Sequence, residues 1–124
     1  MTLPRIEANH HVLAVPDAEE TARFFVSALG FERVPVADPG WRFVKKDGCM
    51  LMLGSCPDAL PPASLGDHSY FSYLVVSDVD AYHEHLVKQG VPLAAPPANK
   101  PWGMRELALR TPDGHRIMLG SRSP

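Results

Sequence analysis

The sequence has little of what marks several protein classes. Among its 124 residues are only two cysteines, Cys49 and Cys56, too few for a disulfide framework and outside any C-x-x-C pattern. There is no run of about 18 apolar residues, and residues 1–7 lack the apolar centre of a signal peptide. We therefore expect a cytoplasmic protein that does not cross a membrane.

Charge of one sign is also scarce. The formal net charge is -2, and the sequence contains no basic block of five residues, so a nucleic-acid partner is not expected. The glycine patterns of nucleotide-binding loops and the Gly-x-Ser-x-Gly of serine hydrolases are missing. What is present, 45% hydrophobic and 21% charged residues, is typical of a globular chain, which we expect to form a single domain over residues 1–124.

The most informative feature is an internal repeat. The segment DGCMLMLGS at residues 47–55 matches DGHRIMLGS at residues 113–121 at six of nine positions. Upstream, HHVLAVPD at residues 10–17 aligns with FSYLVVSD at residues 71–78. The second copy is longer by about six residues, which we place in the proline-rich segment 94–100. We predict one module over residues 8–57, a linker over 58–67 and a second module over 68–122.

Each module follows the same order of elements. A short β-rich run comes first, and Asp17 or Asp78 then provides a helix N-cap, with Gly30 or Gly90 ending the helix. Three strand-like runs follow in each copy, at residues 32–36, 41–44 and 49–53, and at 91–94, 105–110 and 115–119. The prediction is an α+β protein with two tandem βαβββ modules.

This doubled pattern resembles a known superfamily. The segments that carry the resemblance are HHVLAVPD at residues 10–17, FFVSALGF at 24–31 and PWGMRELALRTPDG at 101–114. They are similar to the vicinal oxygen chelate superfamily, which includes glyoxalase I, extradiol dioxygenases and bleomycin-resistance proteins. The last segment is similar to the Trp-Gly-Arg-Glu-Phe…Asp-Pro-x-Gly signature of the bleomycin-resistance branch. The resemblance covers residues 8–121 and implies a cupped mixed sheet around a cleft, in a homodimer whose modules often pair across chains.

The resemblance also implies where a metal would bind. Enzymes of the superfamily hold a divalent ion with side chains from the first and last strands of each module, which here are His10, Met52, Phe71 and Met118. Only one of these is an imidazole and none is a carboxylate, whereas thioethers are soft ligands that favour Cu(I). We therefore expect neither a metal ion nor another cofactor.

The same positions are suited to binding an apolar ligand. Methionine adapts its shape and contacts aromatic rings favourably, and the repeat alignment puts Phe71 and Tyr73 on one strand face. Trp41 and Trp102 can stack on a flat ligand. In the alternative interpretation, Met52, Met118, Phe71 and the tryptophans simply pack in the core or in a dimer interface.

Two polar residues leave alternatives open. Glu106 either meets a cationic ligand or forms a salt bridge with Arg105 or Arg116. His10 is either a general base or a hydrogen-bonded histidine left in the cleft, since the sequence provides no carboxylate to orient it.

These residues lead to two hypotheses for function. The first is a metal-free protein that binds a hydrophobic or aromatic small molecule, such as an antibiotic, without changing it. The second is a metal-dependent lyase, isomerase or dioxygenase whose ligands lie elsewhere. We favour the first and expect no catalytic residue, His10 being the candidate if there is one.

Overall fold

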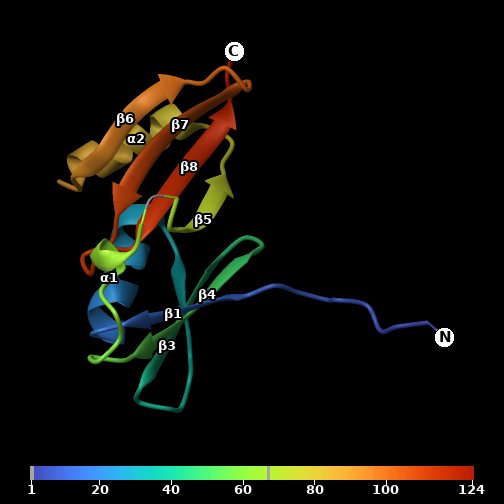
Figure 1. Ribbon diagram of the computed structural model, residues 1–124, viewed down its shortest axis with the longest axis vertical. Coiled ribbons are helices and arrows are strands. Elements are labelled where there is room, and N and C mark those ends of the chain that lie inside the picture. Colours follow the sequence, from blue (N-terminus) through green and yellow to red (C-terminus); the bar gives the residue numbers. More distant parts are fainter. Residues whose placement is uncertain (1, 67) are drawn as a thin grey trace.

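The computed structural model describes residues 2–66 and 68–124, which form two four-stranded sheets, each with a helix against one face (Figure 1). In the first module, β1 (His11–Val15) and α1 (Ala18–Leu29) precede β2 (Glu32–Val34), β3 (Trp41–Lys46) and β4 (Cys49–Ser55). The strand order is β1-β4-β3-β2, with β1 parallel to β4 and the other pairs antiparallel.

The second module repeats this arrangement. A short 3-10 helix, η1 (Pro62–Ser64), leads to β5 (Tyr70–Val75) and α2 (Val79–Lys88), and then to β6 (Leu93–Asn99), β7 (Met104–Arg110) and β8 (Arg116–Arg122). The order is β5-β8-β7-β6, with β5 parallel to β8. The predicted pair of βαβββ modules with mixed sheets is confirmed.

The helices begin where the sequence predicts. Asp17 has extended backbone angles, and its Oδ1 accepts hydrogen bonds from the amides of Glu19 and Glu20, while Gly30 ends α1 in the left-handed region at φ 77°. Asp78 caps α2 in the same way through the Ala81 amide. The repeated Asp therefore has the same structural role in both modules.

The core lies between each sheet and its helix and continues across both modules. Leu51 and Leu53 of β4, like Ile117 and Leu119 of β8, are at most 1% exposed. They belong to one buried cluster that extends from α1 to α2. Burial of these side chains is the main source of stability for a fold of this size.

One predicted strand is misplaced. We expected a strand over residues 91–94 and a loop over 94–100, but the chain forms β6 over Leu93–Asn99, with Pro96 and Pro97 inside it. Its one strand neighbour in the sheet is β7, and the register shifts between Leu93 and Ala95 and again between Ala95 and Ala98. Proline lacks an amide donor and is accepted at such irregular edge positions.

Two further features concern the outside of the molecule. Residues 2–10 have no regular structure, are exposed, and extend away from the two modules (Figure 1). Neither helix of the described chain has the length and apolar character needed to span a membrane.

Candidate functional site

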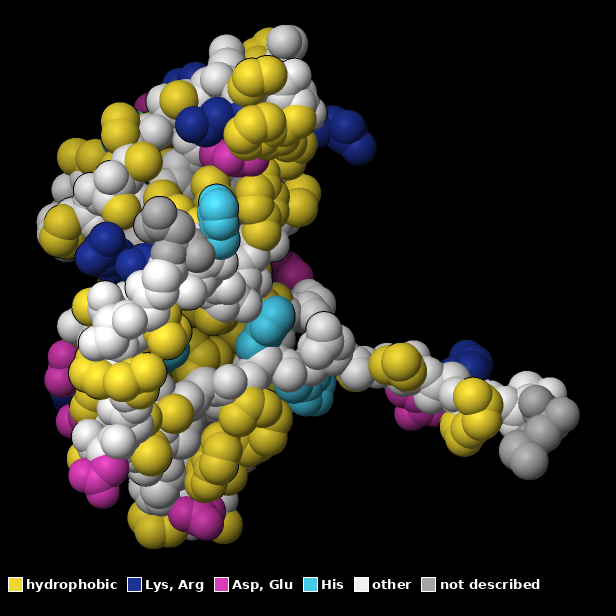
Figure 2. Space-filling view, viewed as in Figure 1, with side chains coloured by type: hydrophobic (Ala, Val, Ile, Leu, Met, Phe, Trp, Pro, Cys, Tyr) yellow, Lys and Arg dark blue, Asp and Glu magenta, His cyan; other side chains and the backbone are white. Residues whose placement is uncertain are grey.

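Each sheet has an outer face, by which we mean the side opposite its helix. Side chains alternate along a strand, so Leu51 and Leu53, which point into the core, leave Met50, Met52 and Gly54 on the outer face of the first sheet. Figure 2 shows hydrophobic side chains gathered on both modules around the hollow between them.

An aromatic ring covers the glycine of the first sheet. Trp41 of β3 lies opposite Gly54, and a Cβ added to that glycine would come 3.1–3.3 Å from the indole ring. Phe43, also on β3, meets the indole edge to face, with ring centroids 6.3 Å apart. Phe43 in turn lies opposite Met52, so aromatic and thioether groups make this part of the outer face apolar, while Lys45 lies opposite Met50 further along β3.

An aromatic ring also covers the glycine of the second sheet. Tyr73 of β5 is paired with Met118 of β8, and its phenol lies across Gly120, where an added Cβ would come 2.0 Å from the hydroxyl oxygen. Gly120 pairs with Glu106 of β7, which brings the phenol to the carboxylate. The absence of a side chain at Gly120 is what permits this approach.

Glu106 is the polar centre of the outer face of the second sheet. Its Oε2 accepts hydrogen bonds from the Tyr73 hydroxyl at 2.8 Å and from the Trp102 indole N–H at 2.7 Å. The residue is only 3% exposed, although it faces away from the helix, whereas Trp102 is 65% exposed and presents its ring to solvent. The structure therefore brings together three of the predicted site residues.

This environment changes the acidity of the phenol. Burial, together with the hydrogen bond to the negatively charged Glu106, raises the pKa of Tyr73 from 10 to about 12. Tyr73 therefore stays protonated and donates to Glu106 throughout the neutral range.

The predicted salt bridge of Glu106 is wrong. Arg105 points to the other side of β7 and pairs with Asp80 of α2, with Nε 3.0 Å from Oδ2. Arg116 donates to the backbone carbonyls of Gly66 and Leu65. Alternation along β7 turns Arg105 away from the carboxylate, whereas the guanidinium of Arg116 is held elsewhere by its contacts with the carbonyls of Gly66 and Leu65.

The two sheets differ at corresponding places. Gly54 and Gly120 are equivalent in the repeat, and the residues opposite them are Trp41 in the first sheet and Glu106 in the second. The same position in the fold thus holds an apolar ring on one side and a buried carboxylate on the other. This asymmetry is not visible in the aligned repeat segments, because β3 and β7 have unrelated sequences.

The prediction that Phe71 shares a face with Tyr73 is wrong. The pairing of β5 with β8 shifts between Tyr70 and Ser72, and this irregularity turns Phe71 toward the core, where its ring meets that of Phe25 at 6.1 Å. His10 precedes β1 and is exposed. Phe71 and His10 therefore lie apart from the group formed by Tyr73, Glu106 and Trp102.

The side chains present do not suit the divalent metal ion that the fold family implies. Met52 and Met118 project from the last strands of the two modules, next to Val12 and Tyr73, and provide thioether sulfur in place of imidazole or carboxylate. Among residues 2–66 and 68–124, no three His, Cys, Asp or Glu side chains come together in a way that could hold an ion.

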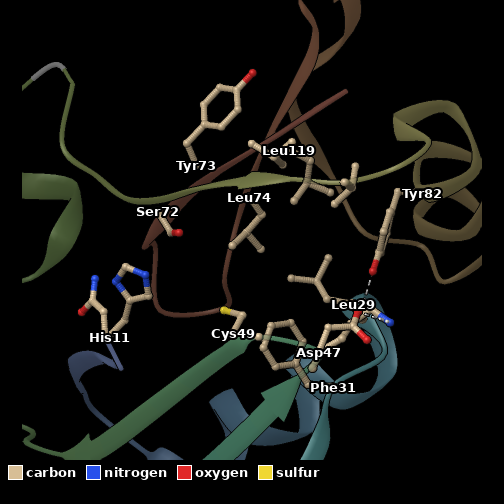
Figure 3. Close-up of a pocket in the computed structure, with 15 residues that line it drawn as sticks. His11, Leu29, Phe31, Asp47, Cys49, Ser72, Tyr73, Leu74, Tyr82 and Leu119 are labelled. Carbon is tan, nitrogen blue, oxygen red and sulfur yellow. Dashed lines mark hydrogen bonds and ion pairs between the residues drawn. The ribbon is translucent and has the colours of Figure 1, made fainter. Parts of the chain in front are cut away.

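A pocket of about 510 Å³ lies elsewhere, at the junction of the two modules. Figure 3 shows Ser72 and Leu74 directed into it from β5, opposite Cys49 and Phe31, while the Tyr73 ring points away. Burial raises the pKa of the Cys49 thiol. The Tyr82 hydroxyl donates to the carbonyl of Leu29 at the rim of this pocket. Of the predicted site residues, only Tyr73 is among those that line this pocket, and its ring points away from it.

Comparisons with known proteins agree with this architecture. Residues 7–119 match the family model described as the Glyoxalase/Bleomycin resistance protein/Dioxygenase superfamily. A glyoxalase/bleomycin resistance protein/dioxygenase from Alicyclobacillus acidocaldarius has a TM-score of 0.79 at 14% identity, covering 95% of this chain and 92% of that one. None of the curated proteins matches the sequence.

A further similar structure is more alike in sequence. TnmS3, described as an antibiotic binding protein from Streptomyces sp. CB03234, is 28% identical, with a TM-score of 0.72 over 97% of this chain and all of that chain. TioX from Micromonospora sp. ML1 has a TM-score of 0.71 at 20% identity, covering 95% of this chain and 98% of that one, which shows a shared fold.

Proposed function

The chain belongs to the Glyoxalase/Bleomycin resistance protein/Dioxygenase superfamily, and from this membership we propose that it binds an aromatic or apolar small molecule without a metal ion and without changing it. The observation that carries the proposal is the chemistry of the outer faces. Thioethers stand at Met52 and Met118, and aromatic rings cover the two glycines. Such surfaces hold a flat ligand by shape and stacking.

An antibiotic is the ligand class we favour. TnmS3, which is described as an antibiotic binding protein, is similar to this chain over nearly its whole length. Sequestration of a compound requires neither a nucleophile nor a metal-bound water, in keeping with the donor set at Met52 and Met118. His10, Trp41, Met52, Tyr73, Trp102, Glu106 and Met118 are the residues we propose for contact with ligand. Phe71, whose ring meets Phe25 in the core, is not among them.

We further propose that a second copy of the chain closes over each outer face. Trp102 and Tyr73, which are 65% and 39% exposed, lie on surfaces open to solvent in one chain. A drug-sized ligand normally has most of its surface buried, so a second copy of the chain would complete the enclosure. The two unpaired cysteines, Cys49 and Cys56, are suited to the cytoplasm, where we place the protein.

The proposal is tested with chelator-treated protein. Intrinsic fluorescence from Trp41 and Trp102 would be titrated with a panel of planar antibiotics, for example doxorubicin, tetracycline, novobiocin and rifampicin. We expect saturable quenching by at least one compound, unchanged by added Mn²⁺ or Ni²⁺. Absence of quenching by all panel compounds contradicts the proposal, and turnover of a compound only with added metal favours a lyase, isomerase or dioxygenase instead.

A matched pair of variants locates the site. Tyr73→Ala removes a ring from the outer face, whereas Tyr70→Ala removes an equally exposed ring from the same strand (39% and 40% exposed). Because a stacked ring contributes about 0.5–1.5 kcal/mol, Tyr73→Ala should weaken binding roughly two- to tenfold. Tyr70→Ala should leave the dissociation constant unchanged, and equal losses in the two variants would contradict this location.

A further inference from the structure

We propose that Glu106 is the polar anchor of the ligand site and that the ligand is a planar aromatic compound with a protonated, N–H-bearing nitrogen. The unshared carboxylate oxygen, Oε1, would accept a hydrogen bond from that nitrogen. This inference rests on the proposed function and adds to it the charge of the ligand.

In the part of the chain that the structure describes, the charge of Glu106 is not compensated by a cationic side chain. The residue is 3% exposed, yet among the described residues no lysine or arginine nitrogen lies within 4 Å of its carboxylate. Its two partners, the Tyr73 hydroxyl and the Trp102 indole, are neutral donors. A buried carboxylate without a cation is costly to the folded state, and a cationic ligand would relieve that cost.

The hydrogen bonds to the carboxylate of Glu106 are made by one of its two oxygens. Both donors bind Oε2, at 2.8 and 2.7 Å, and no described residue donates to Oε1. Among the described residues, Oδ2 of Asp113 is the one fully buried side-chain nitrogen or oxygen atom that lacks a hydrogen bond. Oε1 of Glu106, which also receives none, is therefore within reach of solvent. The carboxylate is thus held in place through one oxygen while the other can receive a donor from outside.

Two aromatic residues surround the carboxylate. The Trp102 ring is exposed and is fixed through its own N–H to Glu106, and the phenol of Tyr73 is fixed by the same carboxylate. Aromatic faces attract cations as well as flat rings. Arg122 extends from the same side of β8, opposite Met104, and is the cation that would favour an anionic ligand instead.

The test uses three probes with the same tricyclic ring. At about pH 8, where glutamate is ionised, 9-aminoacridine is a cation with N–H donors, acridine is neutral and acridine-9-carboxylate is an anion. Calorimetric titration of the wild-type protein should give a dissociation constant at least about tenfold lower for 9-aminoacridine than for acridine, since the hydrogen bond is charge-assisted. The anion should bind most weakly of the three.

Two variants distinguish a specific contact with Glu106 from an effect of the protein's overall charge. Glu106→Gln keeps an oxygen for Tyr73 and Trp102 but removes the charge and turns the other position into a donor, so the preference for 9-aminoacridine should fall to within about twofold. Glu84→Gln removes an equal charge from an exposed position on α2 and should keep the full preference. Circular dichroism confirms that each variant is folded.

The outcomes distinguish this inference from the proposed function. If acridine or its carboxylate binds wild-type protein as tightly as the cation, or if Glu106→Gln keeps the preference, the inference is wrong while ligand binding stands. If none of the three probes binds, the inference is also wrong, and the antibiotic panel decides the proposed function separately. If Glu106→Gln does not fold, the inference is decided by the wild-type protein alone, from the ratio of its dissociation constants for acridine and 9-aminoacridine.

Discussion

Gly120 determines whether Tyr73 can reach Glu106. A methyl group at Gly120 would lie 2.0 Å from the phenol oxygen, so Gly120→Ala should displace the ring and leave Oε2 with Trp102 alone. Loss of one hydrogen bond to a charged acceptor costs about 1.5–3 kcal/mol, partly offset by about 0.5–1 kcal/mol from the lower chain entropy of alanine. We expect urea unfolding to show a loss of roughly 1 kcal/mol.

The control for this variant is Gly48→Ala, in the turn between β3 and β4. No atom lies within 4 Å of a Cβ added at Gly48, so its unfolding free energy should change by less than about 0.5 kcal/mol. A loss in Gly48→Ala as large as in Gly120→Ala would show that the phenol contact is not the cause.

The hydroxyl of Tyr73 provides a pH-dependent signal. Its pKa is raised to about 12 in the folded protein against about 10 in the unfolded chain, so folding favours the protonated phenol. The resulting stabilisation is fully present below pH 10 and is lost as the pH rises from about 10 to about 12. Stability of Tyr73→Phe should therefore fall less steeply over that interval.

Absorbance of tyrosinate measures the same group directly. In an alkaline titration of the folded protein, one of the three tyrosines should titrate near pH 12, and that step should be missing from Tyr73→Phe. In Glu106→Gln the pKa of Tyr73 should move down toward 10, because the negative acceptor that raises it is gone. Titration of all three tyrosines near pH 10 in the wild type would contradict the hydrogen bond.

The placement of single residues was the hardest part to predict from sequence. Strict alternation along β5 put Phe71 beside Tyr73, but the register shift after Tyr70 turns Phe71 inward. The hydrogen-bond donors of Glu106 could not be predicted either. Trp102 lies in a turn, and Tyr73 and Glu106 lie on two strands that are not neighbours in their sheet. Such contacts depend on strand pairing, which a single sequence does not fix.

At the scale of elements, the repeat segments contain not only the last strand of each module but also a residue that joins this strand to the helix. Ser55 and Ser121 end the repeated Leu-Gly-Ser, and their hydroxyls accept hydrogen bonds from the amides of Ala18 and Val79, the first residues of the two helices. The last strand of each module is thereby tied to the start of its helix. This contact explains physically why the repeat includes the serine.

Removal of one of these hydrogen bonds between strand and helix should lower the unfolding free energy measurably. In Ser121→Ala the Val79 amide, which belongs to a residue only 1% exposed, loses its acceptor, and we expect a loss of about 1–2 kcal/mol in unfolding free energy. Ser64→Ala, at an exposed position in η1, is the matched control and should change stability by less than about 0.5 kcal/mol. Equal losses of unfolding free energy in the two variants would contradict a stabilising role for the hydrogen bond between Val79 and Ser121.

β6 shows the limit of prediction for elements. The β1–α1 order, the helix caps and the turn at Asp47 follow from local sequence, and all are present. Two consecutive prolines argue against a strand, yet β6 tolerates Pro96 and Pro97 because it pairs with one neighbour only and its register is irregular. Edge position is a property of the whole sheet and is not encoded in the segment itself.

At the scale of the molecule, we propose that the two modules fold as one unit. The buried cluster includes residues of both, the Tyr82 hydroxyl of α2 donates to Leu29 of α1, and a ring nitrogen of His115 lies 3.2 Å from the Ala14 carbonyl. We therefore expect a single cooperative transition.

The two tryptophans allow this to be checked, since Trp41 lies in the first module and Trp102 in the second. Fluorescence of Trp102→Phe then reports on the first module alone, and fluorescence of Trp41→Phe on the second. In each variant the urea midpoint from fluorescence should coincide with that from far-ultraviolet circular dichroism. Separate midpoints for the two probes would mean that the modules unfold independently.

Native mass spectrometry tests the central claim, metal-independent ligand binding, most directly. Chelator-treated protein would be mixed with the panel compound that quenches tryptophan fluorescence most strongly, with and without added Mn²⁺, Ni²⁺ or Zn²⁺. The account predicts a complex of protein and compound with no metal ion, in the same abundance under all conditions. A compound retained only when about one metal ion per chain is bound would contradict it.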